Sequence, residues 1–109
     1  MATFTLMSSA TAFGPAGTTQ LSPVSVPGNP LRASYTFTIG GPTTEFAGCT
    51  ILASVDGQTF LPLLTMTIEP FGPNSVTVFN SETPNYIQYD AQLNYISPAG
   101  NMATVVMTV

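Results

Sequence analysis

The chain has 109 residues, of which 44% are hydrophobic and only 6% are charged, and its formal net charge is -4. Because Arg32 is the only Lys or Arg residue, the chain cannot neutralise several phosphates, and we expect neither nucleic acid nor a membrane surface as a partner. The sequence has no His and a single Cys, Cys49, which excludes a disulfide within the chain, a zinc or copper site with nitrogen and sulfur ligands, and a histidine base.

Apolar and polar residues alternate along most of the chain, and turns rich in Pro and Gly recur at short, regular intervals. Alternation is typical of strands with one buried and one solvent-exposed face, and such turns indicate a sandwich or small barrel. We predict an all-β fold, a single antiparallel β-sandwich of jelly-roll or Ig-like type over residues 1–109. The predicted strands are 3–7, 19–26, 32–39, 46–55, 59–68, 75–79, 86–96 and 102–109.

Residues 8–31 differ from the rest, because they are rich in small residues and Pro and almost uncharged. Two interpretations stay open: a long loop with one weak strand, or an extended arm that becomes ordered on a neighbouring subunit. Residues 1–4 lack the basic and apolar regions of a secretory signal, and no apolar run approaches the ~20 residues of a membrane span. We therefore expect neither export by that route nor a membrane anchor.

The middle of the chain carries the strongest local pattern, Asp56-Gly57 between two hydrophobic arms. It predicts a β-hairpin in which these two residues take the positive φ angles of a tight turn. Pro62 lacks a backbone donor, which indicates an edge strand or a bulge in the second arm. Cys49 lies in an apolar run without a basic neighbour, so we interpret it as a small buried hydrophobe rather than a reactive thiol.

The last residues, 102–109, are apolar to the end and uncharged. Such a segment must be covered either by its own sheet or by another chain. Met7 and Met107 lie near the two ends of the chain, where flexible methionine side chains suit an apolar interface, although core packing explains them equally well.

No group of residues predicts catalysis, metal binding or a cofactor. Of the five carboxylates, Asp56 is explained by its turn, and Glu45, Glu69 and Glu82 stand beside Gly or Pro loops, where solvated carboxylates are common. Asp90 lies inside a strand pattern, where it either faces solvent or pairs with Arg32 to fix an interface or a register. The Ser and Thr hydroxyls have no activating base, so we expect no enzymatic activity.

The tyrosines of the seventh predicted strand are the remaining candidates for binding. Tyr89 and Tyr95 are separated by an even number of residues, which predicts that they share one face of the strand. A row of Tyr on a strand is more often a core edge or a cross-strand pair than a platform for stacking sugars. Glycan binding stays open as an alternative.

Residues 54–63, SVDGQTFLPL, resemble a stretch of the form Ser-x-Asp-Gly-x-x-aromatic-x-Pro-Leu that is common in β-sandwich structural proteins of tailed bacteriophages. Residues 85–89, NYIQY, resemble the strand that often follows, with Gln88 where Arg is frequent. The hairpin motif also occurs in galactose-binding-like domains. With its missing Lys and His and its Thr-, Gly- and Pro-rich strands, the chain is most similar to small capsid cement or decoration proteins.

This resemblance implies a virion structural protein on the capsid exterior, assembled in the host cytoplasm, that binds the major capsid protein and stabilises the mature head. It also implies self-association as a trimer or dimer, with terminal arms that clasp neighbours. The alternatives are another virion component (a tail, fibre or head-completion subunit) and a glycan-binding β-sandwich module. The residues expected at the protein interface are Phe4, Leu6, Met7, Phe13, Leu21, Arg32, Asp90, Met107 and Val109.

Overall fold

The computed structural model describes residues 2–10, 24–26, 32–40, 46–69, 74–82, 87–97 and 102–109, and the regular structure of these residues is entirely β-strand. The all-β prediction is confirmed, and each predicted strand overlaps an observed one. The strands are β1 (Thr3–Ala10), β2 (Val24–Ser25), β3 (Arg32–Gly40), β4 (Phe46–Ser54), β5 (Leu61–Ile68), β6 (Ser75–Glu82), β7 (Gln88–Ser97) and β8 (Met102–Thr108).

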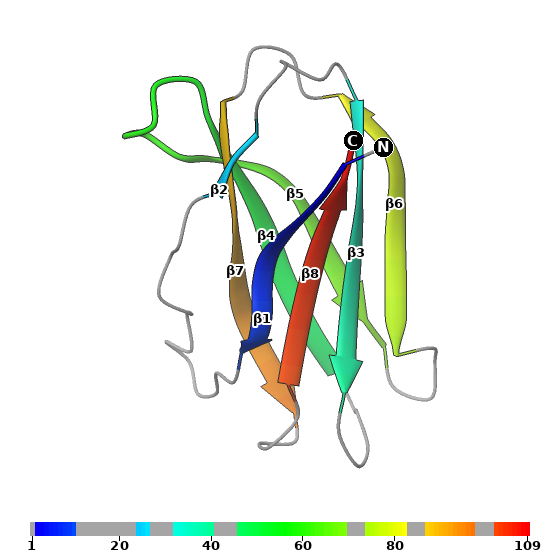
Figure 1. The fold of residues 1–109 in the computed structure, drawn as a ribbon. Coiled ribbons are helices and arrows are strands. Elements are labelled where there is room, and N and C mark those ends of the chain that lie inside the picture. The colour runs from blue at the N-terminus through cyan, green and yellow to red at the C-terminus, as the bar shows by residue number, and fades with distance from the viewer. Residues whose placement is uncertain are drawn as a thin grey trace.

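The strands form two antiparallel sheets that pack face to face, with the orders β1-β8-β3-β6 (the terminal sheet) and β2-β7-β4-β5 (the loop sheet) (Figure 1). The pairs β4–β5, β3–β6, β2–β7 and β1–β8 show that the chain folds in half at the β4–β5 loop, and that the doubled chain then wraps around itself. This is the strand order of a jelly roll, so of the two predicted sandwich types the structure has the first.

The two ends of the described chain meet in the terminal sheet. Thr3 is opposite Thr108, and Ala2 and Val109 exchange two backbone hydrogen bonds of 3.2 and 2.9 Å. Strand β8 lies between β1 and β3, which occupy its two hydrogen-bonding edges. The apolar C-terminal segment is therefore covered by its own sheet, which is one of the two predicted alternatives.

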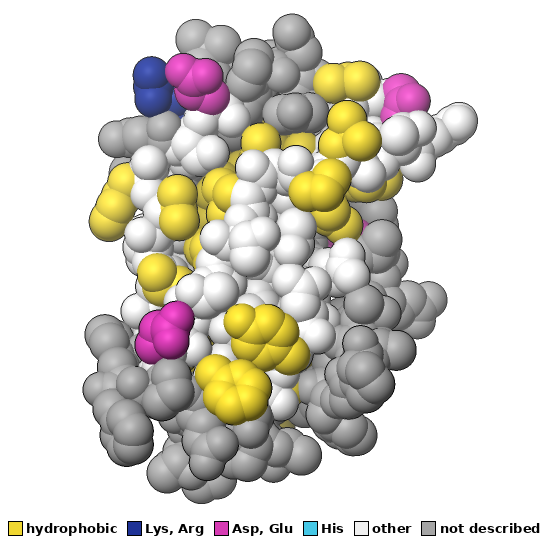
Figure 2. Space-filling view, turned by 180° about the vertical axis from the view of Figure 1, so that it is seen from behind, with side chains coloured by type: hydrophobic (Ala, Val, Ile, Leu, Met, Phe, Trp, Pro, Cys, Tyr) yellow, Lys and Arg dark blue, Asp and Glu magenta, His cyan; other side chains and the backbone are white. Residues whose placement is uncertain are grey.

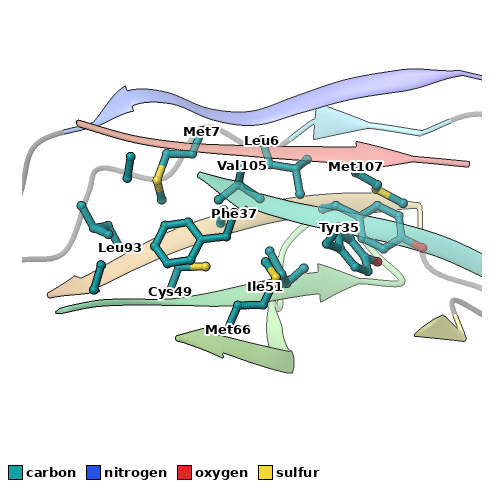
Figure 3. Packing of buried hydrophobic residues seen from close by; sticks show 14 of the residues in the cluster. Leu6, Met7, Tyr35, Phe37, Cys49, Ile51, Met66, Leu93, Val105 and Met107 are labelled. Atoms are coloured by element: carbon teal, nitrogen blue, oxygen red, sulfur yellow. The ribbon is translucent and has the colours of Figure 1, made fainter. Parts of the chain in front are cut away.

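The core fills the space between the two sheets, because alternate residues of each strand point inward. In β3 the buried positions are Ala33, Tyr35, Phe37 and Ile39, with less buried residues between them. Figure 3 shows side chains of the terminal sheet, including Phe37 and Val105, pointing toward those of the loop sheet. Burial of each large apolar side chain contributes about 1.5–3 kcal/mol. The large apolar side chains with the least exposure are Tyr35, Tyr89, Phe37, Ile39, Ile51, Leu93, Met107, Val105 and Cys49.

The β4–β5 connection is a loop over residues 55–60 rather than the predicted tight turn. Gly57 has the expected positive φ of 79°. The oxygen atoms of Ser54 and Asp56 hold the loop: the Gly57 N–H donates to Ser54 Oγ (2.8 Å), and the N–H groups of Gln58 and Thr59 donate to Asp56 Oδ1 (2.8 and 2.9 Å). A loop wider than a two-residue turn is possible because these side-chain oxygens accept hydrogen bonds from its backbone N–H groups.

The expectations for Pro62 are confirmed. Strand β5 is an edge strand of the loop sheet, and its register with β4 shifts so that Ile51 faces Leu64 while Leu52 faces Pro62. The shift leaves one extra residue on β5, as in a β-bulge.

Only parts of the predicted loop or arm of residues 8–31 are described. Residues 8–10 continue β1, and Val24 and Ser25 pair with Tyr89 and Gln88 of β7. Residues 11–23 and 27–31 lie outside the described part of the chain.

Cys49 is completely buried, and its predicted role as a small core hydrophobe is confirmed. Burial raises the pKa of the Cys49 thiol to about 12, so the native protein holds almost no thiolate near neutral pH. We predict that 5,5′-dithiobis(2-nitrobenzoic acid) leaves Cys49 unmodified in native buffer and labels it completely in concentrated urea. Rapid labelling of the native protein would contradict this assignment.

Asp56 makes the stability of the loop depend on pH. The hydrogen bonds from Thr59, Gln58 and Ser54 lower the pKa of the Asp56 carboxyl below its ordinary value. The stabilisation is therefore fully present above the ordinary pKa of about 3.9 and is lost as the pH falls through the lower folded-state pKa. We predict that urea unfolding shows wild type more stable than Asp56→Asn at pH 7, and that this advantage shrinks below about pH 4. An advantage independent of pH would contradict the prediction.

Candidate interaction surfaces

Three of the residues predicted at the interface belong to the core instead. Leu6, Met7 and Met107 are at most 6% exposed, because the inward positions of β1 and β8 place them against the loop sheet (Figure 3). This placement corrects the expectation that they contact a partner. Phe4, opposite Met107, and Val109 are partly buried against the same core and keep some exposed surface.

The other predicted interface residues fall in different places. The Arg32 guanidinium lies 3.8 Å from a carboxylate oxygen of Glu82, and both side chains are well exposed, so this ion pair contributes at most about 1 kcal/mol. Asp90 is 1% exposed, and its Oδ1 accepts a hydrogen bond of 2.8 Å from the Ala91 N–H. The solvent-facing interpretation of Asp90 is therefore wrong. Phe13 and Leu21 lie outside the described residues.

The two tyrosines of β7 do not share a face. Tyr89 is completely buried, whereas Tyr95 is 39% exposed. The cause is a register shift: the consecutive residues Gly48 and Cys49 of β4 face Tyr95 and Leu93, which leaves Asn94 as an extra residue in β7. Such a bulge reverses the alternation beyond it. Tyr89 is thus removed as a candidate for stacking a ligand.

Several large hydrophobic side chains are exposed on the described surface, and none of them is among the predicted interface residues. Figure 2 shows the molecule from the side of the loop sheet, where hydrophobic groups are separated by a mostly uncharged surface. Phe46 and Phe79 are the neighbours of the inward-facing residues Ala47 and Val78, so alternation along each strand indicates that they point outward. The exposed side chains are Phe46, Val55, Leu61, Phe79, Ile87, Tyr95 and Met102.

Three of these side chains surround the end of β4 and form the loop-end group: Val55, Leu61 and Ile87. Val55 follows Ser54, Leu61 is opposite Ala53, and the Ile87 N–H donates to the Ser54 carbonyl oxygen at 2.8 Å. Their exposures are 59%, 57% and 41%. Hydrophobic surface that is grouped in this way is typical of an interaction site.

Phe46 and Tyr95 form a second group, the aromatic platform. Their ring centroids lie 5.8 Å apart and the rings are inclined by 55°. The Tyr95 ring covers Gly48, since a Cβ atom built on that glycine would lie 2.6 Å from two ring carbons. The missing side chain of Gly48 is what allows the ring to lie against the backbone of β4.

The carboxylates of the described residues are dispersed. Glu69 and Glu82 are exposed, Asp56 caps the β4–β5 loop, and Asp90 is buried; Glu45 lies outside the described residues. Within the part of the chain that the structure describes, no three His, Cys, Asp or Glu residues are grouped as metal ligands. In the same part, no helix has the length and hydrophobicity needed to cross a membrane.

The strand order defines the molecule as a jelly-roll β-sandwich, an architecture that includes viral capsid and lectin domains. A scan against known protein families found no match, and a search of curated proteins found none with significant similarity. The fold is similar to that in the crystal structure of the SPBc2 prophage-derived protein YomS, with a TM-score of 0.61 over 98% of this chain and 90% of that chain. The two sequences are 10% identical, so the similarity is one of fold.

The packing of Tyr95 on Gly48 predicts strong coupling between the two positions. Gly48→Ala introduces a methyl group where the ring lies, and we expect a loss of about 1–3 kcal/mol in the free energy of unfolding. In a Tyr95→Ala background the same substitution is expected to cost almost nothing, because the space is open. A double-mutant cycle with urea unfolding measures the coupling, and additive effects would contradict the ring placement.

Proposed function

We propose that the chain is a virion structural protein of a bacteriophage and, within that class, a capsid decoration protein. It binds the outside of the major capsid protein shell, stabilises the mature head and has no enzymatic activity. The observation that carries this proposal is the presence of large exposed hydrophobic side chains, led by Phe79 at 73%, on a chain with 6% charged residues.

An isolated β-sandwich with this surface is poorly protected against association. Phe79 lies on β6, an edge strand of the terminal sheet, and the residues of β6 include no Lys, Arg or Pro. Such residues are the common means by which edge strands avoid pairing with other chains. A protein that functions in an assembly needs no such protection, because its partners cover the exposed strand and side chains. We therefore also propose that the chain self-associates as a dimer or trimer.

The fold supports the phage assignment, since the jelly roll is common in viral capsid domains and the similar YomS structure is that of a prophage-derived protein. The resemblance of residues 54–63 to phage structural proteins points in the same direction. These residues span the end of β4, the β4–β5 loop and the start of β5, and they include two members of the loop-end group, Val55 and Leu61.

Stabilisation of the head follows from linkage. A subunit that binds the expanded shell more tightly than the immature shell stabilises the expanded state by the difference between the two binding free energies. With only 6% charged residues, the chain is expected to make mainly apolar and hydrogen-bonded contacts. Binding is therefore expected to change little with salt concentration.

A sedimentation assay with purified protein and expanded or unexpanded capsids of its phage tests the proposal. We predict saturable binding to expanded capsids at a fixed stoichiometry, with little change between about 50 and 200 mM salt. We predict at least about tenfold weaker binding by Phe79→Ser, because the most exposed aromatic side chain of the described residues is lost as an anchor. Thr65→Ser, an exposed change on the loop sheet, is the matched control. No binding to expanded capsids at micromolar concentration would reject the proposal, and binding to isolated tails alone would favour the tail alternative.

A further inference from the structure

The aromatic platform of Phe46 and Tyr95 lies on the outer face of the loop sheet beside hydroxyl and amide side chains. The register of this sheet places Tyr95, Gly48 and Thr67 in one row across β7, β4 and β5. The neighbouring row holds Gln92, Thr50 and Thr65. A flat apolar surface therefore adjoins groups that donate and accept hydrogen bonds without carrying charge.

The Tyr95 ring is held in place while part of its surface stays accessible to solvent. One side of the ring covers the backbone at Gly48, and the side chain as a whole is 39% exposed. Phe46 is 44% exposed, and its ring is inclined by 55° to that of Tyr95. The two rings thus form a shallow angled surface that needs little ordering when a ligand binds.

Polar groups beside the rings are also positioned before binding. The Asn94 side-chain amide donates to Thr50 Oγ1 at 2.8 Å, and both residues are half-buried. This hydrogen bond fixes the orientation of Asn94, the extra residue of the β7 bulge, next to Tyr95. A few oriented polar groups at the margin of an aromatic surface are the usual composition of a small-ligand site.

The charge around the platform selects among ligands. Glu69 directly follows Ile68, which is opposite Ala47, so among the described residues it is an acidic residue close to Phe46 in the sheet. Arg32, the one cationic residue of the sequence, is on β3 of the other sheet. A carboxylate with no cation beside it disfavours acidic ligands and tolerates neutral ones.

We propose that the aromatic platform binds an uncharged pyranose unit of a glycan. The C–H face of the sugar ring stacks on Tyr95 with Phe46 as a side wall, because weakly positive C–H groups are attracted to the negative face of an aromatic ring. Thr50 and Asn94 contact the sugar hydroxyls. The site is on the sheet opposite the one that carries Phe79, so it extends the proposed function to attachment to a sugar-coated surface.

Saturation-transfer NMR tests this site with the methyl pyranosides of glucose, galactose, mannose and N-acetylglucosamine, and with sialic acid as the acidic probe. Irradiation of the aromatic protons is expected to transfer saturation to the ring protons of at least one neutral probe, with a Kd on the order of 1–10 mM. Phe46→Ala is expected to weaken sugar binding at least about fivefold, the size of effect expected for a lost stacking contact. Gly48→Ala is also expected to weaken sugar binding, because the added methyl group displaces the Tyr95 ring. Phe79→Ala is the matched control, an exposed aromatic outside the platform, and is expected to leave sugar binding unchanged.

Three results would overturn the inference. The first is no saturation transfer to any neutral sugar, and the second is saturation transfer to sialic acid alone. The third is an equal loss of sugar binding in Phe46→Ala and Phe79→Ala. If the sugars fail and Phe46→Ala instead weakens capsid binding, the platform is part of a protein interface. Because the capsid assay and the sugar assay are separate, failure of this site leaves the proposed function standing, and the reverse also holds. Thermal unfolding of each variant confirms that it is folded.

Discussion

The hydrogen bonds that Ser54 and Asp56 donate and accept at the β4–β5 loop set the point where the chain doubles back, and the remaining architecture depends on this point. The pairs β4–β5, β3–β6, β2–β7 and β1–β8 follow from it in order, with a register that stays almost constant from Ala53 opposite Leu61 to Thr3 opposite Thr108. A slip of one residue that no bulge absorbed would exchange the inner and outer faces of the slipped strand. Packing of the core in turn stabilises the strand register that the β4–β5 loop sets.

Much of this architecture was predictable from local sequence, because alternation and turn residues report directly on a half-buried strand. The range predicted for β3 ends one residue before the observed strand, and the edge position and bulge at Pro62 followed from its missing donor. Local patterns do not report which strands pair, so the jelly-roll order was not distinguished from an Ig-like one. The prediction of a tight turn at Asp56-Gly57 is wrong, because the connection is a loop over residues 55–60. In this loop the oxygen atoms of Ser54 and Asp56 accept hydrogen bonds from backbone N–H groups that would pair across the strands in a shorter turn.

The candidate interaction residues were predicted less well, for a physical reason. Apolar residues near the ends of the described chain, such as Met7 and Met107, suit a protein interface and a core equally well. They are buried because the other sheet packs against them, and the local sequence does not show this packing. The prediction that Tyr89 and Tyr95 share a face is wrong because the bulge at Asn94 leaves no mark in the alternation of β7 itself. Gly48 was the available sign, since a glycine inside a strand often marks a bulge or a close approach.

The pairing of β1 with β8 joins residues from opposite ends of the described chain, and this has a consequence for folding. Contacts between such distant residues form late, because loop-closure entropy opposes them until the intervening strands are in place. During synthesis on the ribosome, the hydrogen-bonding edge of β1 has no partner until β8 has emerged. All-β sandwiches typically fold on the millisecond-to-second scale, which prolongs the time during which that edge is unpaired.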